Sequence, residues 1–155
     1  MIRQYFRKYF EKLKVIAGKI LHTNDSPVKI AVGFTLGVFI GVFPTLFIGG
    51  ILAVGLCALF KLNYTAALLG MAVTANPVVS PLVWIVSAKI GGLIFSENID
   101  SVIDMFKSGT LFKSAGRAVF IYFAGNLVVS IIVSVIAFFS AKTIFERHSR
   151  KMGKR

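Results

Sequence analysis

Residues 30–60 read IAVGFTLGVFIGVFPTLFIGGILAVGLCALF, an uncharged apolar run that decides the fold. As a single α-helix this run would be about 46 Å long, whereas the hydrocarbon core of a bilayer is about 30 Å thick. Pro44 interrupts it, because proline removes a backbone hydrogen bond and disfavours the helical conformation of the preceding residue. We therefore expect two short helices, about 28–42 and 45–60, that form a hairpin which crosses or re-enters the membrane.

A second apolar stretch covers residues 64–95, and Lys89 is its only charged residue. The prolines of Asn76-Pro77 and Pro81 are predicted to break this stretch in the same way. A third stretch, 118–141, has neither proline nor charge and is long enough for an ordinary transmembrane helix. The predicted parts are a basic amphipathic helix (1–25), a membrane domain (26–95) with two proline-broken segments (28–60 and 64–95), a polar loop (96–117), a transmembrane helix (118–141) and a basic tail (142–155).

The composition is that of a membrane protein. Apolar residues make up 56% of the chain and charged residues 15%, against about 25% charged residues in a soluble domain. A soluble protein of this length has too little interior to bury so much apolar surface. The expected fold is therefore an all-α, multi-pass helical membrane protein with proline-broken or re-entrant helices.

The net charge of +12 gathers at the two ends of the chain. Seven of the eighteen Lys and Arg residues lie in residues 1–29, and six lie in residues 142–155. Basic flanks beside apolar segments are typical of cytoplasmic anchors next to anionic lipid headgroups. We expect a bacterial inner-membrane protein with both termini cytoplasmic and no nucleic-acid partner, since a nucleic-acid binder would carry its charge on a soluble fold.

The N-terminal part, residues 1–25, is predicted to be an amphipathic helix that lies in the membrane interface. One side of this helix is apolar and the other is cationic. Its apolar face consists of Ile2, Tyr5, Phe6, Tyr9, Phe10, Leu13, Ile16, Ala17 and Ile20. After it, Ser26 is expected to cap a new helix and Pro27 to occupy its first position.

Small residues recur at four-residue spacing along the predicted membrane helices. Gly33, Gly37 and Gly41 share one helix face, and Ala66, Gly70 and Thr74 repeat the pattern, as do Asn126, Ser130 and Ser134. Such faces let helices approach closely. These faces could serve structure alone, by packing the helices into a compact bundle or a homo-oligomer. Alternatively, they could line a polar path through the membrane domain.

The helix breaks are the candidate substrate site. A helix broken within a bilayer frees backbone groups, which in transporters hold a substrate or ion. The candidate residues are Pro44, Asn76, Pro77, Pro81 and Lys89. The alternative for the breaks is a kink repaired by hydroxyl groups of Thr45, Thr74 or Ser80. Lys89 either extends its side chain to the headgroups or contacts an anionic lipid or a phosphate-bearing substrate.

Enzyme chemistry finds little support in this sequence. The apolar stretches contain no carboxylate and no histidine, so acid–base pairs are absent from them. The single cysteine, Cys57, excludes an intrachain disulfide and a cysteine-based zinc site. We expect no catalytic residue, no cofactor and no metal site.

A spaced set of Gly, Asn and Pro residues over residues 26–95 resembles a known family. The set is Ser26-Pro27, Ile30-Ala31, Gly33, Gly37-Val38-Phe39, Gly41, Pro44, Asn63, Ala67, Gly70, Asn76-Pro77 and Pro81-Leu82. It is similar to the bacterial membrane family called domain of unknown function 2062. The sequence departs from that family after Pro44, where Thr45-Leu46-Phe47-Ile48 replaces an expected glycine and glutamine, and after Gly70, where Met71-Ala72-Val73 replaces the usual polar or aromatic residues.

The resemblance implies a multi-pass inner-membrane protein without an assigned activity. Some relatives join this domain to a glycosyltransferase domain, which implies work on envelope glycolipids. Two hypotheses follow. The chain is either a small transporter-like or lipid-handling protein that acts through its broken helices, or a non-catalytic scaffold for an envelope glycolipid or glycosyltransferase system.

Overall fold

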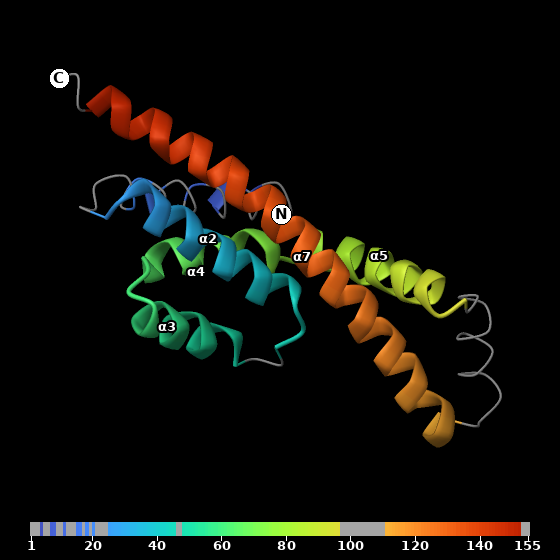
Figure 1. Ribbon diagram of the computed structural model, residues 1–155. Helices are drawn as coiled ribbons and strands as arrows, with labels where there is room; N and C mark the ends of the chain where they lie inside the picture. The colour runs from blue at the N-terminus through green and yellow to red at the C-terminus, as the bar shows by residue number, and fades with distance from the viewer. Residues whose placement is uncertain are drawn as a thin grey trace. The chain divides into compact units, whose positions relative to one another are not determined.

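The structure is a computed structural model, and the residues it describes are all-α, as the sequence predicts. It describes residues 25–45, 48–96 and 111–152, together with isolated positions between 4 and 20. In α7 the side chains are described only over residues 116–147. The helices are α2 (Pro27–Val42), α3 (Gly49–Leu59), α4 (Tyr64–Thr74), α5 (Val79–Ile94) and α7 (Leu111–Met152) (Figure 1).

The chain divides into two compact units. The first unit comprises Met1–Asn76 and Val133–Arg155, and the second comprises Pro77–Ile132. The first unit therefore holds α2, α3, α4 and the last part of α7, while the second holds α5 and the first part of α7.

Local capping explains where α2 begins. The Ser26 side chain accepts a hydrogen bond from the Lys29 backbone nitrogen at 3.3 Å, and Pro27 occupies the first position of the helix. Both predictions are confirmed. The helix ends at Val42, directly before the extended Phe43 and then Pro44.

The sequence predicted that this helix begins near residue 45, but α3 begins at Gly49. It ends at Leu59 in a tight turn that reverses the chain. Lys61 adopts a left-handed conformation with φ of 53°. Its nitrogen donates to the Ala58 oxygen, and the Leu62 nitrogen donates to the Cys57 oxygen at 2.8 Å. This pair of hydrogen bonds is a Schellman motif, which turns the chain back towards α4.

Two apolar clusters form the core of the first unit. Ile40, Ala53, Cys57 and Ala67 join α2, α3 and α4. Ile20 is fully buried in the second cluster, whose other buried members are Ile30, Ala66 and Leu69, and Ile16, Phe34 and Phe145 pack against it.

The second cluster bears on the predicted interfacial helix over residues 1–25. Two members of its apolar face, Ile16 and Ile20, pack on protein rather than facing outwards. The reason is that α2 and α4 offer them an apolar surface that the sequence did not reveal as a neighbour. The positions of Ile2, Tyr5, Phe6, Tyr9, Phe10, Leu13 and Ala17 lie outside the described residues.

The structure corrects the interpretation of Pro81 as a helix break. Pro81 lies in the first turn of α5, after Val79 and Ser80. The amides of a first helical turn have no partner within the helix, so proline is tolerated there. The break itself covers the four residues between Thr74 and Val79.

The helix predicted over 118–141 is longer than expected. α7 has 42 residues and continues to Met152, through much of the segment that we predicted to be a basic tail. The sequence misses this extension because charged residues do not end a helix when they have good helix propensity. The predicted polar loop over 96–117 is wrong for residues 111–117, which belong to α7, while residues 97–110 lie outside the described part of the chain.

Candidate functional site

The helices α2 and α4 pack backbone to backbone along a seam of small residues, and they lie side by side in Figure 1. A Cβ atom added at Gly33 would lie 2.6 Å from the Asn63 carbonyl oxygen. At Gly37 an added Cβ would overlap the Ala67 carbonyl oxygen and lie 2.8 Å from the Ala67 Cα atom. The seam therefore has no room for side chains at these positions.

The seam continues through Gly41 and Gly70. A Cβ added at Gly41 would meet the Thr74 hydroxyl and lie 3.0 Å from the Met71 Cα atom. A Cβ added at Gly70 would overlap the Phe34 carbonyl oxygen. The structure thus brings together all four glycines that the sequence placed on packing faces.

The order of these contacts shows that α2 and α4 are parallel. Gly33 lies against Asn63, Gly37 against Ala67, and Gly41 against Met71. Residue numbers rise together along both helices, so their C-terminal ends share one end of the pair. The breaks that follow, at Pro44 and at Asn76, therefore begin at the same end of the first unit.

Three backbone carbonyl groups in the last turns of α4 accept hydrogen bonds from within the chain. The Thr74 hydroxyl donates to the carbonyl oxygens of Gly70 and Met71, at 3.1 and 3.3 Å. The Asn76 side-chain nitrogen donates to the Val73 oxygen at 2.5 Å, and the Ala75 amide donates to the Met71 oxygen. Of the three hydroxyl groups suggested to repair the breaks, that of Thr74 does so here.

The opposite end of the α2–α4 pair carries a polar contact that sequence reasoning missed. Asn63 caps α4 by accepting a hydrogen bond from the Ala66 amide at 2.7 Å, and its Nδ2 atom donates to Asp25 Oδ2 at 2.7 Å. Asn63 is only 5% exposed. The preference of asparagine for helix N-caps could have identified the cap, but not its partner 38 residues away.

In the second unit, α5 and α7 are joined by small and polar residues. The Asn126 side chain donates to the Ser87 hydroxyl at 3.1 Å, and the Ser130 hydroxyl donates to the Asn126 carbonyl oxygen at 2.7 Å. Gly91 faces the Ile121 backbone, and Gly125 faces the Ser87 backbone. These contacts form an antiparallel seam, because the residue numbers fall along α7 as they rise along α5.

Two candidate residues, Ser134 and Lys89, take no part in the contacts described above. Ser134, in the first unit, is 8% exposed, and its hydroxyl has no hydrogen-bond partner among the described residues. Lys89 is exposed on α5. The described residues contain no group of three or more His, Cys, Asp or Glu that could hold a metal ion.

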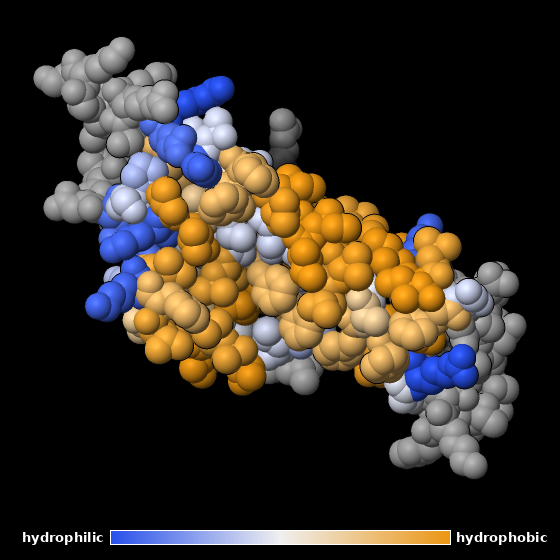
Figure 2. All heavy atoms as spheres, in the orientation of Figure 1, coloured by the Kyte–Doolittle hydropathy of each residue, from blue (hydrophilic) through white to orange (hydrophobic). Residues whose placement is uncertain are grey.

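Apolar side chains dominate the exposed surface of the described helices, as the orange atoms in Figure 2 show. α7 is long and apolar enough over Gly116–Arg147 to cross a membrane, and 33% of its most apolar part is buried. α4 and α5 pass the same test together, as a pair bent at the break between them. The fold defines an all-α protein with one or two helices that could span a membrane.

The chain belongs to the family DUF2062, described as "Uncharacterized protein conserved in bacteria", whose model matches residues 12–153. The resemblance seen in residues 26–95 is thereby confirmed and extends over most of the chain. No curated protein and no solved structure matches the sequence.

Proposed function

We propose that this chain is a multi-pass protein of the bacterial inner membrane that handles lipids through the short helices of its first unit. One observation carries the proposal: α2, α3 and α4 have 16, 11 and 11 residues and yet expose large apolar side chains. Helices of these lengths measure about 24, 17 and 17 Å, less than the hydrocarbon core. They would enter the bilayer without crossing it.

The distribution of charge in the first unit supports one orientation in the membrane. Asp25, Lys29 and Lys61 lie at the end where α2 and α4 begin. No charged residue follows until the breaks at Pro44 and Asn76. The charged end suits the cytoplasmic headgroups, and the breaks would lie deep in the hydrocarbon.

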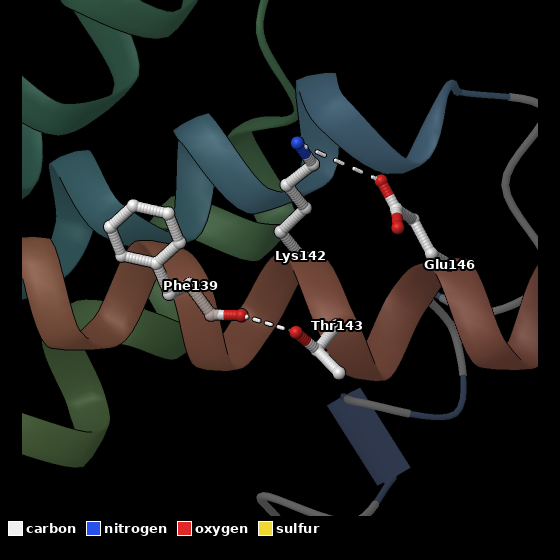
Figure 3. A network of polar contacts seen from close by, with 4 residues as sticks. All are labelled: Phe139, Lys142, Thr143 and Glu146. Carbon is white, nitrogen blue, oxygen red and sulfur yellow. Dashed lines mark hydrogen bonds and ion pairs between the residues drawn. The ribbon is translucent and has the colours of Figure 1, made fainter.

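The topology that follows has both termini in the cytoplasm. The hairpin over 28–60 returns to its own side, the 64–95 stretch crosses outwards and α7 returns. At the inner end of α7 the exposed Phe139 gives way to a polar turn. There Lys142 pairs with Glu146 at 4.0 Å and the Thr143 hydroxyl donates to the Phe139 oxygen (Figure 3). Such a change from apolar to charged residues is typical of a membrane boundary.

Lipid suits this unit better than an ion as the molecule handled. The carbonyl groups of Gly70, Met71 and Val73 already accept hydrogen bonds from Thr74, Ala75 and Asn76, which makes these three oxygens poorer ligands for an ion. Apolar helices shorter than the bilayer thin it locally, and a thinner bilayer lowers the barrier to a crossing headgroup.

Reconstitution of the full chain in liposomes tests this function. Liposomes containing a headgroup-labelled phospholipid should exchange it between leaflets faster than protein-free ones. The double substitution Pro44→Ala and Pro77→Ala should slow the exchange, because both breaks could then continue as helix. Gly55→Ala is the matched control, since a Cβ at Gly55 meets nothing within 4 Å. Wild-type protein without any lipid exchange would refute the proposal.

The internal hydrogen bonding of the breaks also favours a second function, a non-catalytic scaffold for another envelope protein. The exposed face of α3, with Ile51 at 78% and Leu59 at 72%, offers an apolar surface for such a partner or for a second copy. Mild extraction of the native complex should then yield a partner in fixed stoichiometry, and a chain purified alone as a monomer would contradict it.

A further inference from the structure

Lys89 is an exposed cation on an otherwise apolar face of α5. Leu82, Ile85 and Leu93 are exposed by 61, 55 and 80%. Together with Lys89 they follow one another at intervals of three, four and four residues, so the four side chains form one stripe along the helix. Ser87, on the other side of α5, is buried against α7.

The described part of the second unit offers Lys89 no countercharge. Residues 77–96 and 111–132 contain no Asp or Glu. Lys89 also lies five residues before Ile94, the last residue of α5, which is about 7–8 Å along the axis.

We propose that Lys89 binds the phosphate group of an anionic phospholipid, whose acyl chains lie along the apolar stripe of α5. The inference rests on the proposed membrane location. An ammonium group supplies three hydrogen-bond donors, and its bonds to phosphate oxygens are strengthened by charge. A phospholipid fits better than free phosphate, because the surface on both sides of Lys89 is apolar and matches acyl chains.

The experiment counts the lipids that the full chain keeps. The protein is reconstituted in nanodiscs with equal amounts of phosphatidylglycerol and phosphatidylcholine, extracted in mild detergent and examined by native mass spectrometry. The wild-type chain should retain phosphatidylglycerol in preference to phosphatidylcholine. Lys89→Leu should weaken that preference about fivefold, the effect expected of one lysine near a lipid surface. Lys89→Arg should preserve it.

Lys29→Met is the matched control. Lys29 is exposed at the first turn of α2 and is one of seven Lys and Arg residues in residues 1–29, so its loss should change lipid retention little. If Lys89→Leu does not insert, Lys89→Gln replaces it, because glutamine keeps the side chain polar. Equal retention of phosphatidylglycerol by wild type and the Lys89 variant would overturn the inference. Release of the wild-type chain from membranes by alkaline carbonate would instead refute the proposed membrane location.

Discussion

Replacing Gly37 with alanine tests the packing on which the first unit depends. An added Cβ would overlap the Ala67 carbonyl oxygen and lie 2.6 Å from the Ala67 carbonyl carbon. These neighbours are backbone atoms, so no side-chain rotation can relieve the overlap and the two helices must separate. Overpacking of this kind costs about 3 kcal/mol at the upper end of the usual range. Alanine recovers about 1 kcal/mol of helix propensity, which leaves about 2 kcal/mol of net destabilisation.

A graded series of glycine variants separates this effect from helix propensity. Gly55→Ala has open space around the new methyl group and should be neutral or stabilising by up to about 1 kcal/mol. Gly33→Ala should fall between the two, since its main conflict is with one atom, the Asn63 carbonyl oxygen at 2.6 Å. Denaturant titration in detergent micelles, followed by circular dichroism, measures the free energy of unfolding of each variant.

The expected ranking is Gly55→Ala most stable, then Gly33→Ala, then Gly37→Ala. The gap of about 3 kcal/mol between the extremes is more than a hundredfold in the unfolding equilibrium. Equal stability of Gly37→Ala and Gly55→Ala would show that α2 and α4 are not in direct backbone contact.

Three further predictions use the same measurement of unfolding free energy. Asn63→Ala should destabilise the chain by about 2 kcal/mol, because it removes the α4 cap and the hydrogen bond to Asp25; an unchanged value would argue against that contact. Lys61→Gly should stabilise it by about 1 kcal/mol, since glycine adopts a positive φ without strain, and a loss of stability would contradict the left-handed turn. Asn126→Leu should cost about 1 kcal/mol by breaking the bond to Ser87, whereas Leu127→Ile, at an exposed position beside it, should change little.

Sequence patterns predicted the helices better than the partners of those helices. The four-residue spacing of Gly33, Gly37 and Gly41 indicates a face for close contact, because helical periodicity is local. In the structure α4, rather than α3, packs against this face of α2. Which helix does so depends on the path of the chain after α2, and helical periodicity carries no information about that path. The same limit explains why the sequence did not identify the Asp25–Asn63 contact, whose partners are 38 residues apart.

The helix ends show a second limit of sequence reasoning. Proline signals interruption wherever it occurs, but its effect depends on its position within the helix. Pro44 follows the last turn of α2, while Pro81 lies in the first turn of α5. Only the first of these ends a helix. The length of α7 was underestimated because apolarity marks the part of a helix that suits lipid, not the whole helix.

The parallel packing of α2 and α4 has a counterpart in the sequence. Small residues at Gly33, Gly37 and Gly41 precede Pro44 with spacings of four, four and three. The same spacings occur in a second copy of the pattern, Ala66, Gly70, Thr74 and Pro77. Each copy makes a helix with a small-residue face and ends it at a proline.

Two such helices can pack face to face in parallel only if the chain returns between them. α3 (Gly49–Leu59) lies between the two helices in the chain and provides that return. An antiparallel pair would have placed one break at each end of the unit. Because the pair is parallel, both breaks lie at one end and the charged residues at the other. This separation of the charged residues from the breaks would let the unit enter a bilayer from one side. It follows from the repeated spacing of small residues before Pro44 and Pro77 and from the short connecting helix α3.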